Sequence, residues 1–571
     1  RKDVKILDFN TLLLLFVLAI CGFALFRRPT RDWKPLKLMN DKQFIYRLII
    51  IVLMLLAIFL RVYKFGMVPG GMNQDGAMAA VDANALANHG TDRFGMSLPV
   101  FFTSWGYGQM SVLLSYLMVP FIKIFGLSVI TARLPILIIS VIAIYVLFKF
   151  VEKLFGKTPA LVVLAFIAIN PWQIMQSRWA IDCNMLPHFL LFSIYFLYLG
   201  LSKKKYLYLS MVFFGLTMYT YGIAFYSIPI ILIVLCAYLL ITHHIKIVDA
   251  LACFGFYLLV AWPILTVIII NFFKLKTVIF GPLTMAFFPY TMRTNDILFF
   301  SDNFFDQLVV NFKSLIDVVF LQKEGLIWNA IPQFGAFYLI TMPFVLLGFY
   351  YLIKKLRKTE KDEKSVIAGR YLIIVWFLVA ILSGLIINNV NLNRINIILY
   401  PMCIFAALGI YFALFEALRN RFIALVILFA FTFSTLGFNY AYFGQTSKEL
   451  AQNFFDGFGS AIQTAENTKA DTVYVTNFTQ SKGSYHVSEI LTQFYAKIDA
   501  LYFQGTGKEF DKSGNELLPY RDRYKYTNFD TNVKPDPTGV YVINIAEKEY
   551  FDSKNYTIKT FEGFGVAIPK K

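Results

Sequence analysis

The sequence predicts an all-α polytopic membrane bundle of about twelve transmembrane helices, with juxtamembrane helices on its outer face and a small extracytoplasmic α/β domain at the C-terminus. Hydrophobic residues make up 58% of the 571 residues and charged residues only 15%, which excludes an ordinary soluble protein. Apolar runs of spanning length recur up to about residue 440, and the chain is polar afterwards. We therefore place a membrane module at 1–445 and a second domain at 446–571. In the second domain we expect helices at 449–467 and 484–498 and strands at 472–476 and 539–544.

Twelve apolar runs are long enough to cross a bilayer when tilt is allowed, since a spanning helix needs about 20 apolar residues. The net charge of +18 arises in this module, because acidic and basic residues nearly balance after residue 446. The positive-inside rule explains this excess, so we expect no nucleic acid partner. The runs lie at 11–26, 44–63, 128–150, 158–172, 183–201, 206–222, 223–242, 248–270, 332–353, 369–388, 395–415 and 421–440.

The loop charges predict how the bundle is oriented. Basic clusters occupy alternate loops, which places those loops in the cytoplasm and the remaining loops and the tail outside. Ser111–Phe125 is apolar, but a crossing there would reverse every later loop, so we expect an interfacial or re-entrant helix on the outer face. The basic clusters are Arg27–Arg47, Lys149–Lys157, Lys203–Lys205, His243–Lys246, Lys354–Arg370 and Arg419–Arg421, and the outward loops are 64–127, 173–182, 271–331 and 389–394.

The first outward loop carries two aspartates seven residues apart, Asp75 and Asp82. Asn73-Gln74-Asp75 can cap a helix that continues to His89, and Gly90 is a natural stop. Residues i and i+7 share one face of a helix, so both carboxylates can point into one cleft. We interpret Asp75 as a catalytic base. The alternatives are a plain N-terminal cap for Asp75 and a structural arginine partner for Asp82.

Arginines lie at the outer ends of several spans, where a charged group still needs a partner. Arg133 begins one span, Arg178 precedes Asp182 by four residues, and Arg394 follows Asn393. A phosphate on a lipid carrier suits guanidinium groups. The alternatives are lipid-headgroup anchors and, for Arg178 with Asp182, an ion pair that braces the loop.

Three short motifs resemble the GT-C glycosyltransferases, in particular the bacterial branch similar to protein O-mannosyltransferases and aminoarabinose transferases (glycosyltransferase family 39). The motifs are Asn73-Gln74-Asp75, then Phe125-Gly126 with Ala132-Arg133-Leu134-Pro135, and then Asn170-Pro171-Trp172 through Ser177–Asn184. The resemblance extends to about residue 440.

This resemblance implies a polyprenyl-phosphate sugar as donor and inverting hexosyl or pentosyl transfer on the extracytoplasmic side. The acceptor would be the hydroxyl of a wall polymer, a glycolipid or a protein. Asp75 occupies the place of the family's base, and Arg394 would hold the carrier phosphate. Relatives carry an acidic residue after the base, whereas this chain has Gly76. The candidate substrate-binding residues are Asn73, Gln74, Asp82, Arg133, Arg178, Asp182, Asn393 and Arg394.

Two other classes of function compete with a transferase. A transporter or flippase of lipid-linked saccharide should place charged residues near the bilayer midplane, whereas here they cluster at the outer ends. A non-catalytic scaffold leaves the Asp75 loop unexplained. We expect no cofactor, because His89 has no second ligand at metal spacing, although the pattern does not exclude a divalent ion.

The remaining ring side chains are expected to be structural. His89 should end a helix, and His188 should pack inside a span. An interfacial aromatic belt is the main interpretation for the tryptophans of the outer loops, and sugar stacking by Trp105 or Trp179 is the alternative. The expected belt residues are Trp105, Tyr107, Trp172 and Trp179.

Overall fold

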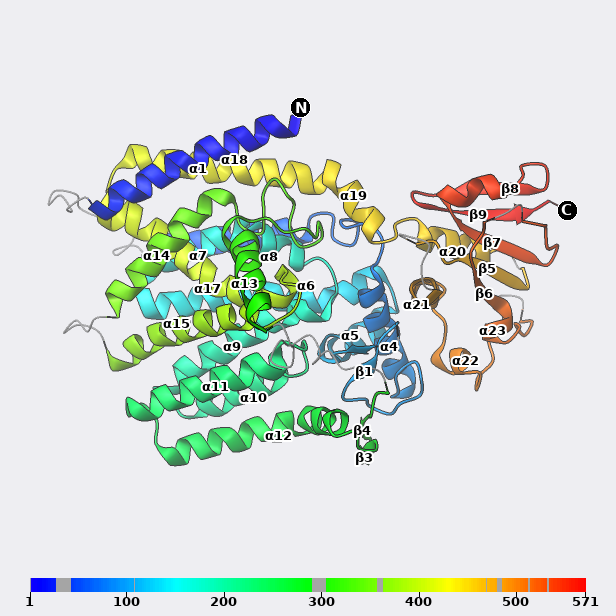
Figure 1. The fold of residues 1–571 in the computed structure, drawn as a ribbon, viewed down its shortest axis with the longest axis horizontal. Helices are drawn as coiled ribbons and strands as arrows, with labels where there is room; N and C mark the ends of the chain where they lie inside the picture. The colour runs from blue at the N-terminus through cyan, green and yellow to red at the C-terminus, as the bar shows by residue number, and fades with distance from the viewer. Residues whose placement is uncertain are drawn as a thin grey trace.

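The computed structural model describes most of the chain and divides it into a long helical bundle and a smaller α/β domain beyond one end of it (Figure 1). The helices of the bundle run along the long axis of the molecule (Figure 1), and the N-terminal helix packs on α14. The residues described are 2–26, 43–106, 108–289, 304–356, 363–468, 470–479, 485–511, 514–530 and 533–570, without the side chains of 2–12.

A helix lies over each of the twelve predicted spans. Eight helical segments in the described chain are long and apolar enough to cross a bilayer, so the multi-pass membrane architecture is clear and the count of twelve stays a prediction. The helices over the predicted spans are α1 (Lys2–Phe26), α3 (Gln43–Val62), α6 (Val129–Phe155), α7 (Lys157–Ile169), α9 (Met185–Gly200), α10 (Lys205–Thr217), α11 (Ala224–Ile241), α12 (Ile247–Phe272), α14 (Met342–Lys355), α15 (Lys364–Leu385), α17 (Leu399–Tyr411) and α18 (Arg421–Phe443).

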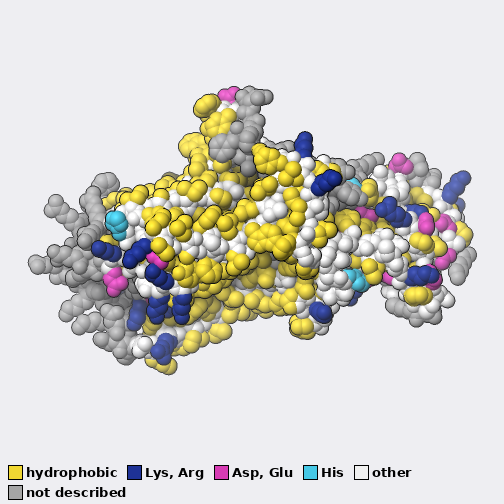
Figure 2. Space-filling model, turned by 90° about the horizontal axis from the view of Figure 1, so that it is seen from below, with side chains coloured by type: hydrophobic (Ala, Val, Ile, Leu, Met, Phe, Trp, Pro, Cys, Tyr) yellow, Lys and Arg dark blue, Asp and Glu magenta, His cyan; other side chains and the backbone are white. Residues whose placement is uncertain are grey.

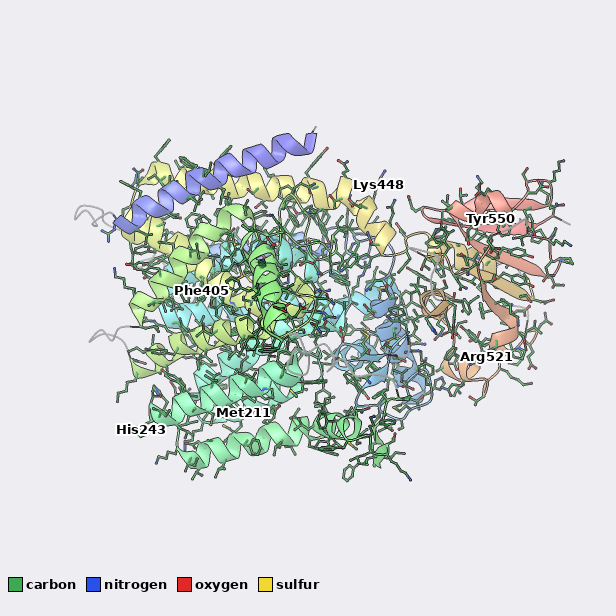
Figure 3. All side chains as sticks on the ribbon, in the orientation of Figure 1. Met211, His243, Phe405, Lys448, Arg521 and Tyr550 are labelled. Carbon is green, nitrogen blue, oxygen red and sulfur yellow. The ribbon has the colours of Figure 1, made fainter. Side chains whose placement is uncertain are left out.

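The two ends of the bundle differ in charge. On the face shown in Figure 2, Lys and Arg side chains gather at the end away from the α/β domain, and hydrophobic side chains cover the length between. His243, in one of the predicted cytoplasmic loops, lies at that same end, whereas Arg521 and Tyr550 lie in the domain beyond the other end (Figure 3). This distribution is typical of a positive-inside membrane protein.

The first outward loop folds at the end of the bundle that faces the α/β domain. It contains α4 (Gln74–His89), the short hairpin of β1 (Phe102–Thr103) and β2 (Gln109–Met110), and α5 (Leu113–Phe125). The 13 residues of α5 span about 20 Å, less than the roughly 30 Å of a hydrocarbon core. Because α7 and α10 have the same length and lie over predicted spans, the non-crossing of Ser111–Phe125 stays a prediction. The helix α5 packs on α4 and α6.

The long outward loop between α12 and α14 adds a second hairpin and a helix. The strands β3 (Val278–Phe280) and β4 (Leu283–Met285) pair, and Val100 donates its amide N–H to the carbonyl of Thr284, so the two outward loops touch. The helix α13 (Phe304–Leu315) leads into η4 (Ile316–Phe320) and packs on α15.

A five-stranded sheet forms the centre of the C-terminal domain, with strand order β6-β5-β7-β9-β8. The two predicted strands form as β5 (Thr472–Thr476) and β7 (Gly539–Asn544), which pair in parallel with Val473 opposite Val540. The predicted helix at 449–467 is two helices, and the one at 484–498 is shorter. The other elements are α19 (Gln445–Asn453), α20 (Phe458–Glu466), α21 (Tyr485–Tyr495), α22 (Ala500–Gln504), α23 (Tyr520–Arg523), β6 (Tyr524–Thr527), η8 (Ile545–Tyr550), β8 (Tyr556–Thr560) and β9 (Phe564–Pro569).

The C-terminal domain packs directly on α4. Its helix α21 contacts α4, and His89 at the end of α4 lies 2.8 Å from the carboxylate of Asp499. Gly71, with φ +72°, faces the carbonyl of Phe454, where a Cβ would come within 2.1 Å of the oxygen. A left-handed, side-chain-free residue is therefore needed at this contact. The helix that carries Asp75 is held between the bundle and the domain.

Candidate active site

The carboxylate of Asp75 lies in the first turn of α4 and is partly exposed. The Asn73 side chain caps this helix by accepting from the amide of Gly76, and Gly90 ends it in a left-handed conformation, as predicted. Because Asn73 is the cap, the carboxylate of Asp75 is not used for that purpose. The indole Nε1–H of Trp105 donates to Asp75 Oδ1 over 2.7 Å. Among the described residues, Asp75 Oδ2 has no hydrogen-bond partner.

Asp82 does not share the environment of Asp75. It is fully buried and pairs with Arg93, with 2.5 Å between Oδ2 and Nη1 and a second bond from the Arg93 amide to Oδ1. Burial raises the pKa of the Asp82 carboxyl, and the Arg93 guanidinium opposes that shift. The alternative role of Asp82 as an arginine partner is confirmed, and a substrate contact for this buried side chain stays a prediction.

The Asp82–Arg93 pair nevertheless supports the site. Arg93 Nη2 donates to the carbonyl of Thr103 over 2.9 Å, two residues before Trp105. One buried ion pair thus ties α4 to the segment that supplies the hydrogen bond to Asp75. Sequence reasoning missed Arg93. The available signal was that Arg93 is the one arginine in the sequence of loop 64–127, which also contains Asp82.

Arg133 is buried, and its guanidinium is hydrogen-bonded to backbone carbonyls. Its guanidinium donates to the carbonyls of Pro69 and Gly71 at 2.9 and 2.7 Å. These bonds fix the turn that leads into α4. The donors of Arg133 are used inside the protein, and the substrate contact predicted for it stays a prediction.

Arg178 is also buried and plays a comparable structural role. It donates to the carbonyls of Arg61 and Tyr63 at 2.6 and 2.7 Å, and to three further carbonyls between Leu60 and Val68. It thereby satisfies the free carbonyls at the end of α3, and its positive charge favours that helix terminus. Burial lowers the pKa of Arg178. Arg178 does not pair with Asp182, whose Oδ1 accepts from the amide of Cys183 instead. The substrate contacts predicted for Arg178 and Asp182 stay predictions.

The segment 176–184 connects the Asp75 side of the site with the Arg394 side. Gly76 lies against the carbonyl of Ala180, where a Cβ would come within 2.6 Å of the oxygen. On the other side, the Asn396 amide donates to the carbonyl of Cys183 over 2.7 Å. The glycine that replaces the relatives' acidic residue is therefore required by packing.

A small cavity opens between this segment and two other outward loops. Asn393 lines it, as do tryptophans from two loops, so the structure brings together parts of 173–182, 271–331 and 389–394. Asp75 and Arg394 lie outside its lining. The lining residues are Trp172, Gln176, Trp179, Asn184, Trp328, Asn329, Leu392, Asn393 and Asn396.

Arg394 is the one predicted substrate-binding arginine that is not fully buried. Its Nη1 donates to the carbonyl of Asn388 over 2.6 Å, and Asn391 caps its helix turn. The buried carboxylate of Glu324 accepts from the amide of Leu392 over 2.9 Å and so fixes the same loop. Sequence reasoning did not single out Glu324. Gln74 is partly exposed beside Asp75, and both stay candidates for substrate contacts together with Asn393 and Arg394.

The aromatic and histidine predictions have mixed outcomes. Trp172 and Trp179 are buried against Tyr400 and Phe454, so their assignment to an interfacial belt is wrong. Trp105 donates a hydrogen bond to Asp75, and Tyr107 lies outside the described residues. His188 is fully buried, with Nδ1 2.7 Å from the hydroxyl of Tyr400, which confirms a packed core residue. His89 ends α4, as predicted. The described residues contain no group of three or more metal-ligating side chains.

A family model described as dolichyl-phosphate-mannose-protein mannosyltransferase matches residues 110–270. This range contains Arg133, Arg178 and Asp182, and it begins after Asp75. The comparison with curated protein sequences gave no match.

Two solved membrane enzymes share the fold over most of the chain. ArnT from Cupriavidus metallidurans, bound to undecaprenyl phosphate, has a TM-score of 0.51 and 12% identity over 92% of this chain and 97% of its own. The Archaeoglobus fulgidus oligosaccharyltransferase, in complex with Zn and sulfate, has a TM-score of 0.50 and 13% identity. That match covers 78% of this chain but only 61% of the oligosaccharyltransferase, so this chain spans less than two thirds of its length. The resemblance to GT-C membrane glycosyltransferases predicted from the motifs is confirmed.

Proposed function

We propose that this protein, whose fold is that of the GT-C membrane glycosyltransferases, moves a sugar from a polyprenyl-phosphate carrier to the hydroxyl of an envelope acceptor. The acceptor is a wall polymer, a glycolipid or a protein, and the reaction takes place on the extracytoplasmic side with inversion. The fold shared with ArnT, whose structure holds undecaprenyl phosphate, supports a lipid-phosphate donor.

In the proposed reaction, Asp75 acts as general base. The acceptor oxygen attacks the anomeric carbon from the face opposite the phosphate, its proton passes to Asp75 Oδ2, and the bond to the carrier phosphate breaks. The products are the glycosylated acceptor and the polyprenyl phosphate. The Trp105 hydrogen bond at Oδ1 orients the carboxylate, so that Oδ2 is the oxygen available for the proton. General-base catalysis typically contributes about 10²–10⁴-fold.

Arg394 is the candidate ligand for the carrier phosphate, because it is the predicted arginine that keeps an exposed part. A guanidinium near the departing phosphate stabilises the charge that develops there. Asn393 beside it lines the cavity between the outward loops, where part of the donor or acceptor would lie.

One observation carries the proposal. Of the six charged residues that the sequence singled out, Asp82, Arg133, Arg178 and Asp182 are buried and used within the protein, whereas Asp75 and Arg394 are not. Asp75 stays partly exposed, with a single indole donor and no cation within ion-pair distance among the described residues. A cap already exists in Asn73, so the position needs no carboxylate for stability.

The experiment is a transfer assay with the purified full-length protein. Polyprenyl phosphates carrying labelled hexoses or pentoses are incubated with envelope fractions, and the anomeric configuration of the product is compared with that of the donor. We expect label in an acceptor with inverted configuration. Movement of the intact lipid-linked sugar across a vesicle bilayer, without transfer to any acceptor, would identify a flippase and contradict the proposal.

A further inference from the structure

A groove opens on the side of the bundle at the end opposite Asp75. The first turns of α3 and the last turns of α6 form its walls, and Lys157 at the start of α7 closes one side. It has a volume of about 840 Å³, counting the part that is open to the outside. Because α3 begins here and α6 ends here, we place the groove at the membrane boundary on the side of the basic loops.

Three cations line this groove and face one carboxylate. Lys149 is ion-paired with Glu152, and the hydroxyl of Tyr46 donates to Glu152 Oε1 over 2.5 Å, so that carboxylate is satisfied within the protein. Arg47 and Lys157 are exposed and have no carboxylate within 4.0 Å among the described residues. The Lys157 ammonium lies 5.1 Å from the centre of the Tyr46 ring. The groove therefore has two positive charges left for an anion.

The opposite end of the groove is apolar and exposed on the outside of the bundle. Ile50, Ile51 and Tyr145 line it, and Ile51 and Tyr145 expose 55% and 48% of their surface. Leu55 and Phe59, about one and two turns further along α3, expose 60% and 59%, so an apolar track leads from the groove toward the middle of the span. A cationic head site that continues into a lipid-facing track matches an anionic lipid better than a free phosphate.

We propose that this groove binds the headgroup of an anionic glycerophospholipid from the leaflet on the side of the basic loops. Its phosphate lies between Arg47 and Lys157, and an acyl chain follows Ile51 and Leu55 along α3. The site is structural or regulatory and is separate from the transfer site at the other end of the bundle. It depends on the membrane position of these helices and not on the proposed transferase activity.

The test measures lipid retained by the full-length protein after purification in a neutral detergent, by native mass spectrometry. The probes are phosphatidylglycerol, zwitterionic phosphatidylcholine, undecaprenyl phosphate and inorganic phosphate. The variant Arg47→Gln with Lys157→Gln removes the two unpaired charges. Its matched control, Lys203→Gln with Lys205→Gln, removes two exposed charges from another basic loop, predicted to lie on the same side of the membrane. Each basic group near a membrane surface strengthens anion binding about fivefold.

We expect phosphatidylglycerol to bind in preference to phosphatidylcholine, with affinity about 30-fold lower in the groove variant and within about threefold of the wild type in the control. An equal loss in both variants would show diffuse surface attraction and overturn the proposal. Unchanged binding in the groove variant would also overturn it. Preferential binding of undecaprenyl phosphate that is lost in the groove variant, or displacement of the lipid by millimolar inorganic phosphate, would replace the glycerophospholipid assignment.

Discussion

Replacing Asp82 with Asn tests whether the buried ion pair holds the loop that orients Asp75. The pair is almost fully buried, since Asp82 is 0% and Arg93 3% exposed. The substitution keeps the shape of the side chain but leaves the Arg93 guanidinium without a counter-charge. The reverse change, Arg93→Met, leaves a buried carboxyl that takes up a proton, because burial raises its pKa.

The magnitude follows from the cost of an uncompensated buried charge. Removing one partner of such a pair costs about 3–5 kcal/mol, so each single variant should lose about 3 kcal/mol of local stability. The double variant Asp82→Asn with Arg93→Met leaves no bare charge, so it should lose no more than about 3 kcal/mol, far from the sum of the two. The coupling energy between the positions is then at least about 3 kcal/mol.

Amide hydrogen exchange is the appropriate assay, because it reports local opening in a protein too large for two-state unfolding. The amides of Asp92 and Leu98, bonded to Met96 and Gly90, should exchange roughly 10²-fold faster in either single variant. The exposed pair Lys508–Glu516 is the control, since breaking it should cost less than about 1 kcal/mol. Wild-type exchange in Asp82→Asn, or additive effects in the double variant, would refute the reasoning.

Three other predictions concern residues of the candidate active site and its supports. Trp105→Phe removes the indole donor to Asp75 and should lower kcat about tenfold or more while the KM for the donor changes little; an equal kcat would show that the bond is incidental. Arg394→Gln should raise the KM for the donor several-fold with an unchanged melting temperature. Arg178→Gln removes the hydrogen bonds to the end of α3 and should instead lower the melting temperature. The opposite pattern would exchange the roles of the two arginines. Gly76→Ala should destabilise the protein by about 1–3 kcal/mol because its Cβ meets the Ala180 carbonyl, while Gly255→Ala, with open space around it, should not; equal effects would contradict the packing argument.

The sequence was sufficient for features that depend on local chemistry. Hydropathy located the helices of the bundle, and capping residues placed α4 between Asn73 and Gly90. The strands β5 and β7 were found because they are central, apolar runs rich in β-branched residues. The strands β6 and β8 were missed because they are short, partly exposed and carry lysine, and β9 was missed because it contains glycine and proline.

The roles of the arginines could not be predicted from the sequence, because a guanidinium binds whichever acceptors the tertiary structure brings to it. Arg178 satisfies the end of a helix more than 110 residues earlier in the chain. The same limit applies to Asp82 and Arg93, because α4 ends at His89 and the pairing depends on how the chain folds back after it. Asp75 was distinguished by a local pattern and a family motif, whereas its Trp105 partner depends on how the loop folds back.

The most direct test of the central claim is the single-turnover transfer rate of Asp75→Asn with a saturating polyprenyl-phosphate sugar. The exposed Asp522→Asn serves as the control for the same chemical change elsewhere. The account predicts a rate about 10²–10⁴-fold below wild type with an unchanged melting temperature, and an unchanged rate for the control. A rate for Asp75→Asn within about twofold of wild type would contradict the assignment of Asp75 as the base.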